Sequence, residues 1–330
     1  MPNHDQQIAQ LRELFLRKLQ ATFSDREPRG LYAPIDYILD LGGKRVRPVV
    51  ALLAAKMFGD DDLSQSLPVA LAVEVFHNFT LLHDDIMDES PIRRGKATVH
   101  EKWDVNTGIL SGDLMLIQAY QHLCEVPNKQ ALPALLCTFN RVATGVCEGQ
   151  QYDVDFESRE DVTIGEYLKM IELKTAVLLG GALEMGALAA GAAQKDADHL
   201  YEFGRLTGLA FQLQDDLLDT FGDSASTGKL KGNDIIRNKK TFLFLKAIEL
   251  LGLEGRAELN RWFTESPADP AEKVIRVIEM MESVGIPAAV AKLRDEFQAK
   301  AYEHLDAAGG TAEAKQTLRA LAEALLRRIN

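Results

Sequence analysis

The chain has 330 residues, of which 46% are hydrophobic and 26% are charged, and it carries a formal net charge of −12. This balance predicts a soluble protein with a sizeable core, and the acidic charge argues against a general nucleic-acid or anionic-membrane surface. The three cysteines show no C-x-x-C spacing, and their odd number argues against a disulfide framework. Because residues 1–7 also lack the features of a signal peptide, we expect a cytoplasmic protein.

Helical periodicity recurs along almost the whole sequence, whereas alternating β-branched runs with hairpin turns are absent from it. The fold class is therefore predicted to be all-α. A length of 330 residues alone suggests about two domains. No Pro/Ser-rich linker or abrupt change of composition divides the sequence, however, so we expect one large domain over residues 1–330.

The first chemically informative segment is a glycine pair followed by basic residues. Gly42–Pro48 reads GGKRVRP and places Lys44, Arg45 and Arg47 at a predicted junction between a loop and a helix. Helix N-termini attract anions, and arginine adds a bidentate fork for phosphate oxygens. In an acidic protein we interpret this segment as a phosphate seat, with a basic surface turn as the alternative.

An acidic motif ends the apolar helix predicted upstream of it. Asp84, Asp85 and Asp88 form a DDxxD pattern, which on a helix places three carboxylates on nearly one face. Carboxylates so placed repel one another unless a cation joins them, and Mg²⁺ prefers one or two carboxylates plus substrate phosphates. Arg93 and Arg94 follow within reach, either to bind phosphate or to neutralise the motif.

Residues 176–193 are apolar apart from Glu184, and this length approaches the roughly 20 residues of a membrane span. The segment is rich in glycine and alanine and carries a charge in its middle, which favours a buried helix of a bundle.

The acidic pattern occurs a second time, at Asp215, Asp216 and Asp219, again among apolar residues. If the two motifs converge, they predict a magnesium-bridged phosphate site. The glycine-rich segment 222–234, which contains Lys229, is either a flexible loop or a lid over phosphate. Beyond residue 250 the sequence predicts amphipathic helices to which we assign no chemistry.

The ordered motifs GGKRVRP, HNFTLLHDDIMD, RRG, EGQQYD, KTA, FQLQDDLLD, GK and NKKT resemble those of trans-isoprenyl diphosphate synthases of the polyprenyl synthetase family, over residues 40–245. The resemblance implies the isoprenoid synthase fold, a helical bundle around a deep central cavity, and a homodimer. It also implies the substrates, isopentenyl diphosphate and an allylic diphosphate. In such a reaction magnesium and fixed cations stabilise the leaving diphosphate, and no protein nucleophile is needed.

The resemblance also implies roles for individual residues. The ligands of three Mg²⁺ ions would be Asp84, Asp88 and Asp215, with Asp85, Asp216 and Asp219 completing the motifs. The contacts to the allylic diphosphate would be Arg93, Lys174, Thr175, Gln212, Lys229 and Lys239. The isopentenyl diphosphate pocket would contain Lys44, Arg47, His77 and Arg94. Gln150 and Asp153 match a segment near the site with less certain roles. The residues that carry catalysis would be Asp84, Asp85, Asp88, Arg93, Lys174, Asp215, Asp216 and Lys229.

The product length is predicted from the helix that precedes the first motif. Phe79 lies five residues before Asp84, about 7.5 Å along the helix axis. The resemblance implies that a bulky residue there acts as a floor for the growing chain, and the alternative is that Phe79 is an ordinary core residue. Its neighbour Thr80 is small. We expect the C20 product, geranylgeranyl diphosphate, with C15 farnesyl diphosphate as the close alternative.

Three other protein classes share some of these features. A ferritin-like di-iron bundle needs two Glu-x-x-His motifs, of which Glu74 and His77 supply one. A terpene cyclase would carry a different second metal motif and no second diphosphate pocket. A non-catalytic subunit of a heteromeric synthase would have lost motif residues, whereas all are present here.

Overall fold

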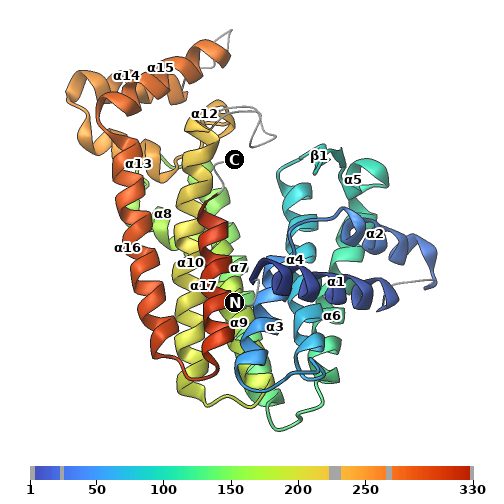
Figure 1. Ribbon diagram of the computed structural model, residues 1–330. Coiled ribbons are helices and arrows are strands. Elements are labelled where there is room, and N and C mark those ends of the chain that lie inside the picture. The colour runs from blue at the N-terminus through green and yellow to red at the C-terminus, as the bar shows by residue number, and fades with distance from the viewer. Residues whose placement is uncertain (1–3, 23–25, 223–231, 265–269, 328–330) are drawn as a thin grey trace. The chain divides into compact units, whose positions relative to one another are not determined.

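The computed structural model describes residues 4–22, 26–222, 232–264 and 270–327. In these ranges the regular structure is helical except for one two-stranded hairpin (Figure 1). The predicted all-α class is confirmed. The hairpin was not predicted, because of its two turn residues, Arg94 and Gly95, only the glycine is a residue that such turns favour.

The chain divides into two compact units, each built from separate stretches of sequence. Unit 1 comprises residues 1–140, 181–201 and 307–321, and unit 2 comprises residues 141–180, 202–306 and 322–330. The first aspartate motif belongs to unit 1 and the second to unit 2. A single domain over residues 1–330 stays a prediction.

Unit 1 is built around α4 (Ser66–Met87), which packs along α3 (Val46–Met57) and α6 (Val105–Glu125). The other elements of unit 1 are α1 (His4–Thr22), α2 (Arg29–Asp40), β1 (Ile92–Arg93), β2 (Lys96–Ala97), α5 (Val99–Lys102), the first part of α7 (Leu132–Ser158), most of α9 (Val177–Ala189), the start of α10 (Gln194–Phe221) and most of α17 (Ala312–Leu326). Most residues of α3 and α4 are buried, as expected for helices that are apolar on nearly all sides.

Two glycines bring α6 close to α4. A Cβ atom at Gly112 would lie 2.2 Å from Nε2 of His83, and one at Gly108 would lie 2.8 Å from Cδ1 of Ile86. Asp104 caps the start of α6 by accepting a hydrogen bond from the backbone N–H of Thr107 at 2.8 Å. The last two turns of α4, which carry the first aspartate motif, are therefore held against the start of α6.

Unit 2 contains the end of α7 and a core of apolar side chains from its remaining helices. These elements are α8 (Ile164–Ile171), the π-helix η1 (Glu172–Ala176), the start of α9 (Val177–Ala189), most of α10 (Gln194–Phe221), α12 (Asn233–Ile236), α13 (Phe242–Leu250), α14 (Leu253–Thr264), α15 (Pro270–Ser283), α16 (Ile286–Ala307) and the end of α17 (Ala312–Leu326).

The apolar segment 176–193 forms α9 and its flanks, and residues 176–189 of it are buried, as predicted. Glu184 within it is only 3% exposed and accepts a hydrogen bond from Oγ1 of Thr138 at 2.9 Å. In the described part of the chain, no helix has both the length and the hydropathy that crossing a membrane requires.

Candidate functional site

The three aspartates of the first motif differ in their surroundings. Asp84 and Asp85 lie in the last turn of α4, and Asp88 follows directly, with its backbone N–H bonded to the Asp84 carbonyl at 2.8 Å. Asp85 is only 3% exposed, whereas Asp84 is partly buried and Asp88 is exposed. The three carboxylates of the motif therefore differ in burial, because consecutive helical residues differ in direction by about 100°.

Arg93 of β1 holds the buried aspartate. Its Nε donates to Oδ2 of Asp85 at 2.6 Å and its Nη2 donates to Oδ1 at 2.8 Å. This parallel fork is the strongest geometry for a guanidinium and a carboxylate. The arginine pair was expected either to bind phosphate or to neutralise the motif. In this structure Arg93 neutralises Asp85.

Arg94 reaches the glycine pair instead. Its φ of 52° and that of Gly95, 76°, are the left-handed values of a type I′ hairpin turn. The Arg94 guanidinium donates to the carbonyl of Gly42 and lies against Gly43, where a Cβ atom would be 2.9 Å from it. The hairpin after the first motif is thus joined to the loop that carries Lys44.

Arg47 and His77 form the centre of the predicted isopentenyl diphosphate pocket. Nη1 of Arg47 lies 3.1 Å from Nε2 of His77. A guanidinium cannot accept a hydrogen bond, so Nε2 of His77 must accept and its proton must sit on Nδ1. Burial, together with the charges of Arg47 and Arg94, lowers the pKa of His77 well below its usual value. His77 is therefore neutral at neutral pH.

Burial also lowers the pKa of Arg47, with the charge of Arg94 acting in the same direction and that of Glu74 opposing it. Three of the four predicted pocket residues, Arg47, His77 and Arg94, thus influence one another, and the fourth, Lys44, is exposed in the loop before α3. A cluster of cations in an acidic protein is costly on its own and is suited to a bound polyanion.

Arg45 does not belong to the phosphate seat, which corrects the interpretation of GGKRVRP. Its side chain is buried and donates to Glu74 of α4 and to the carbonyl of Leu39. Glu74 also accepts from Nδ2 of Asn78 at 2.9 Å. The sequence alone does not reveal this ion pair, because Arg45 and Glu74 lie far apart in the chain. The pair also occupies the Glu74 carboxylate, which a di-iron site would require.

The second motif also contains aspartates held by protein donors. Asp216 accepts hydrogen bonds from the Tyr167 hydroxyl and from Nε2 of Gln212, the latter at 3.0 Å. Asp219 accepts from the backbone N–H of Asp234 at 2.9 Å. Both aspartates are buried, whereas Asp215 is partly exposed. Sequence reasoning missed Tyr167 and Asp234, which carry no motif of their own.

Asp216 resists ionisation. Burial, with the charge of Asp234 adding to it, raises the pKa of Asp216 to about 7, while the hydrogen bonds from Tyr167 and Gln212 oppose this rise. The second motif therefore carries less negative charge near neutral pH than three free carboxylates would. A bound cation would favour the ionised form.

The KTA segment lies in the π-helix η1. Lys174 donates to Asp153 of α7, which gives that aspartate a defined partner. Gly149 of α7 lies so close that a Cβ atom there would be 2.3 Å from the backbone nitrogen of Lys174. Isolated π-helical turns are rare and often occur at functional sites. The sequence showed the KTA motif but not its unusual backbone.

The remaining predicted residues of unit 2 differ in burial and in their hydrogen-bond partners. Lys239 is exposed and Thr175 is partly buried, while Lys240 donates to the carbonyls of Phe156, at 2.9 Å, and Arg159. Lys240 is thus a structural residue. Gln150 is buried, and neither polar atom of its amide has a hydrogen-bond partner within the described residues. Lys229 and most of the predicted lid lie outside the described residues.

Within the described ranges, no group of three or more His, Cys, Asp or Glu side chains is arranged to hold a metal ion by itself. This is compatible with Mg²⁺, which is commonly bound by one or two carboxylates together with substrate phosphates. Asp84 and Asp88 offer such carboxylates in unit 1, and Asp215 offers one in unit 2. Convergence of the two motifs on one diphosphate stays a prediction.

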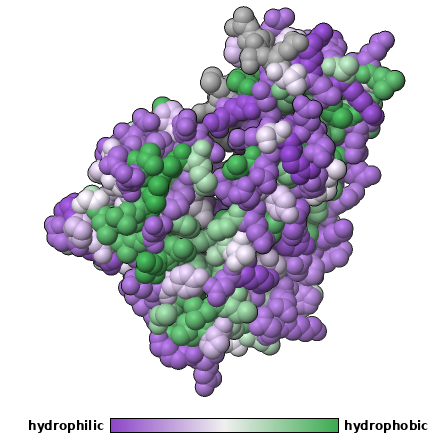
Figure 2. Space-filling view, turned by 180° about the vertical axis from the view of Figure 1, so that it is seen from behind, coloured by the Kyte–Doolittle hydropathy of each residue, from purple (hydrophilic) through white to green (hydrophobic). Residues whose placement is uncertain are grey.

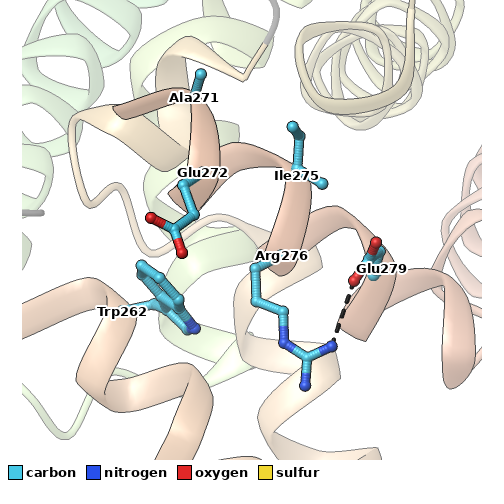
Figure 3. Close-up of a pocket in the computed structure, with 6 residues that line it drawn as sticks. All are labelled: Trp262, Ala271, Glu272, Ile275, Arg276 and Glu279. Atoms are coloured by element: carbon cyan, nitrogen blue, oxygen red, sulfur yellow. Dashed lines mark hydrogen bonds and ion pairs between the residues drawn. The ribbon is translucent and has the colours of Figure 1, made fainter. Parts of the chain in front are cut away.

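A pocket of about 580 Å³ lies between α14 and α15 (Figure 3). It is lined by Trp262, Ala271, Glu272, Ile275, Arg276 and Glu279. The one arginine among them is paired with Glu258 at 2.8 Å and with Glu279 at 3.3 Å. None of these residues belongs to the predicted site, and their acidic character is unsuited to a diphosphate.

Comparison with known proteins gives consistent matches. A family model described as polyprenyl synthetase matches residues 28–281. A geranylgeranyl diphosphate synthase of Methanosarcina mazei is 43% identical over 244 residues, which cover 72% of this chain and 75% of that protein. A geranylfarnesyl diphosphate synthase of Natronomonas pharaonis is 35% identical over an aligned length of 341, which covers 97% of this chain and 96% of that protein. A crystal structure of a geranylgeranyl pyrophosphate synthase matches with a TM-score of 0.93 and 46% identity, covering 98% of this chain and 99% of that chain.

Proposed function

Because the chain belongs to the polyprenyl synthetase family, we propose that it is a prenyltransferase that condenses isopentenyl diphosphate with an allylic diphosphate to form geranylgeranyl diphosphate. The observation that carries this proposal is common to both aspartate motifs. In each, protein donors hold at least one aspartate, Asp85 in the first motif and both Asp216 and Asp219 in the second, while a neighbouring carboxylate remains nearer the surface.

Asp84, Asp88 and Asp215 are the carboxylates that would hold magnesium, for which we propose three ions. When bound, Mg²⁺ neutralises charge on the departing diphosphate. The protein's own contribution is twofold. Arg93 neutralises Asp85 and fixes the end of α4, which carries the neighbouring carboxylates. Lys174 and Lys239 supply positive charge. We propose that the contacts to the allylic diphosphate are completed by Arg93, Lys229, Thr175 and Gln212.

Lys44, Arg47, His77 and Arg94 would bind the diphosphate of isopentenyl diphosphate. Neutral His77 accepts one hydrogen bond from Arg47 and so orients a guanidinium whose other N–H groups can donate to phosphate oxygens. Arg94 is positioned by the Gly42 carbonyl. Such an arrangement binds an anion through fixed donors and requires no metal.

The chemistry after ionisation places few demands on the protein. The double bond of isopentenyl diphosphate attacks the allylic carbocation, a proton is lost, and the chain becomes five carbons longer. The departed diphosphate is a sufficient proton acceptor, so no dedicated base is required. The surrounding helices must keep water from the cation, because water would quench it.

We propose that Phe79 and Thr80 set the length of the product. Phe79 packs against Phe76 and His83, so a bulky ring is held one to two turns before Asp84. The Methanosarcina mazei relative is a C20 synthase and supports this length, whereas the Natronomonas pharaonis relative is named for a longer product. A C15 product and a non-catalytic subunit are the competing outcomes.

A homodimer is proposed as the assembly. On α6 the side chains of Val105, Ile109, Leu110 and Ile117 are between 43% and 59% exposed. Figure 2 shows hydrophobic side chains gathered in patches on the face it displays, which is typical of a surface covered by another subunit. We also propose a cytoplasmic location, with which Cys124, Cys137 and Cys147 agree because they form no disulfide bond.

The test uses the purified chain with labelled isopentenyl diphosphate, Mg²⁺ and each of the C5, C10 and C15 allylic starters. We expect all three to be extended to C20, as seen by chromatography, and chelation of the metal to abolish extension. A protein that extends none of them would be a non-catalytic subunit. Light scattering on the same sample measures the mass, which should be twice that of the 36.5 kDa chain.

A further inference from the structure

We propose that His83 is a further specificity-determining residue, which supports the Phe79 ring and thereby limits the length of the product. This inference rests on the proposed function. His83 has no place in the metal or diphosphate sites described above. The evidence for its role is the way that α4 and α6 hold it.

Aromatic side chains form a continuous row along one side of α4. The ring centroids of Phe139 and Phe76 are 5.1 Å apart, those of Phe76 and Phe79 are 5.6 Å apart, and those of Phe79 and His83 are 4.8 Å apart. The last pair meets edge to face. Phe79 lies three residues after Phe76 and His83 lies four residues after Phe79, which are the spacings of neighbours on a helix surface. Phe79 therefore has an aromatic neighbour on each side.

One end of this row is anchored in the core and the other is anchored on α6. Phe76 and Phe139 are almost completely buried. At the other end, Nε2 of His83 lies 3.3 Å from the carbonyl oxygen of Ile109. The imidazole occupies the space beside Gly112, where any Cβ atom would be 2.2 Å from Nε2. Gly112 thus creates the notch that fixes His83.

A side chain can stop a growing hydrocarbon only if it does not move when the chain presses on it. An isolated Phe79 ring could change rotamer and admit another five-carbon unit. Phe76 is immobilised by close packing on one side of the partly buried Phe79 ring, and His83 is the aromatic neighbour on the other side. We infer that the imidazole blocks this movement, so that product length depends on a pair of residues and on the glycine behind them.

The experiment compares four variants of the full chain by product chromatography and by melting temperature. His83→Ala should raise the share of products longer than C20 by about 2–10-fold, the effect expected from losing one edge-to-face aromatic contact. His83→Phe keeps a ring beside Phe79 and should retain C20. Gly112→Ala displaces the imidazole and should act in the same direction as His83→Ala.

Gly108→Ala is the matched control. It also introduces a methyl group between α6 and α4, one turn earlier, but there it meets Ile86 rather than His83. Its products should remain C20. An equal shift in Gly108→Ala and Gly112→Ala would reveal a general effect of helix spacing and overturn the inference.

Two further outcomes separate this inference from the proposed function. A wild-type product of C20 with an unchanged product ratio in His83→Ala, even at reduced turnover, would overturn only the role of His83. A wild-type chain that extends no starter would overturn the proposed function and this inference together.

Discussion

Arg93 donates two parallel hydrogen bonds to Asp85, at 2.6 and 2.8 Å, and so ties β1 to the end of α4. The pair separates the carboxylates of the first motif into one used by the protein and two left nearer the surface. We therefore expect substitutions of Arg93 and Asp85 to affect stability, and substitutions of Asp84 to affect activity.

Arg93→Gln should lower the free energy of unfolding by about 2 kcal/mol, because it leaves the buried Asp85 carboxylate without its charged partner. Asp85→Asn in the same background should recover part of this loss. Urea denaturation of the wild type, the two single variants and the double variant gives the coupling energy directly. Additive losses would mean that the pair contributes no coupling.

Asp84→Asn should leave stability nearly unchanged and reduce kcat by about 10²-fold or more, because it removes a proposed metal ligand without disturbing the Arg93 pair. The measurement is turnover at saturating Mg²⁺, together with urea denaturation. Full activity of Asp84→Asn would remove Asp84 from the metal site.

His77 should make the protein less stable in mild acid. Its pKa is lowered in the folded state, so the unfolded chain binds a proton below its ordinary pKa of about 6.5 while the folded chain does not. Its contribution to stability is full above that pH and is lost as the pH falls toward the folded-state pKa. Between pH 7.5 and 5.5, wild type should lose more unfolding free energy than His77→Gln. Parallel curves for the two proteins would contradict an imidazole that stays neutral in the folded protein.

Asp216 should show the opposite pH dependence. Its pKa of about 7 lies above the unfolded value of about 3.9, so the stability it contributes is full in acid and is lost as the pH rises through 7. In metal-free buffer, Asp216→Asn should therefore be more stable than wild type at pH 8, by up to about 4 kcal/mol. The two proteins should converge at pH 4. Activity with Mg²⁺ should fall in the same variant, and a loss of stability at pH 8 would contradict the raised pKa.

Phe79→Ala should lengthen the product beyond C20, because it removes the ring proposed as the floor. Thr80→Phe is the matched opposite change and should shorten the product toward C15, since it adds a ring at the neighbouring position. Both are measured by chromatography of products from the C15 and C5 starters. Unchanged chain length in Phe79→Ala would remove Phe79 from this role.

The sequence alone was sufficient for the all-α class, for the family, and for the segments that contain the candidate site. Helical periodicity and the DDxxD and GGKRVRP motifs are local patterns, so they can be recognised without knowledge of the fold. The prediction that residues 176–193 form a buried helix rather than a membrane span depended on local composition in the same way.

Tertiary structure decided which members of each motif are held by other protein groups. Arg45 is withdrawn from the phosphate seat by Glu74, and Asp216 is held by Tyr167, in both cases through contacts between residues far apart in the chain. The π-helical backbone at Lys174 likewise accompanies its contact with Gly149 of another helix. A sequence lists charged groups, but their protonation and partners depend on burial and on neighbours brought close by folding, which no local pattern contains.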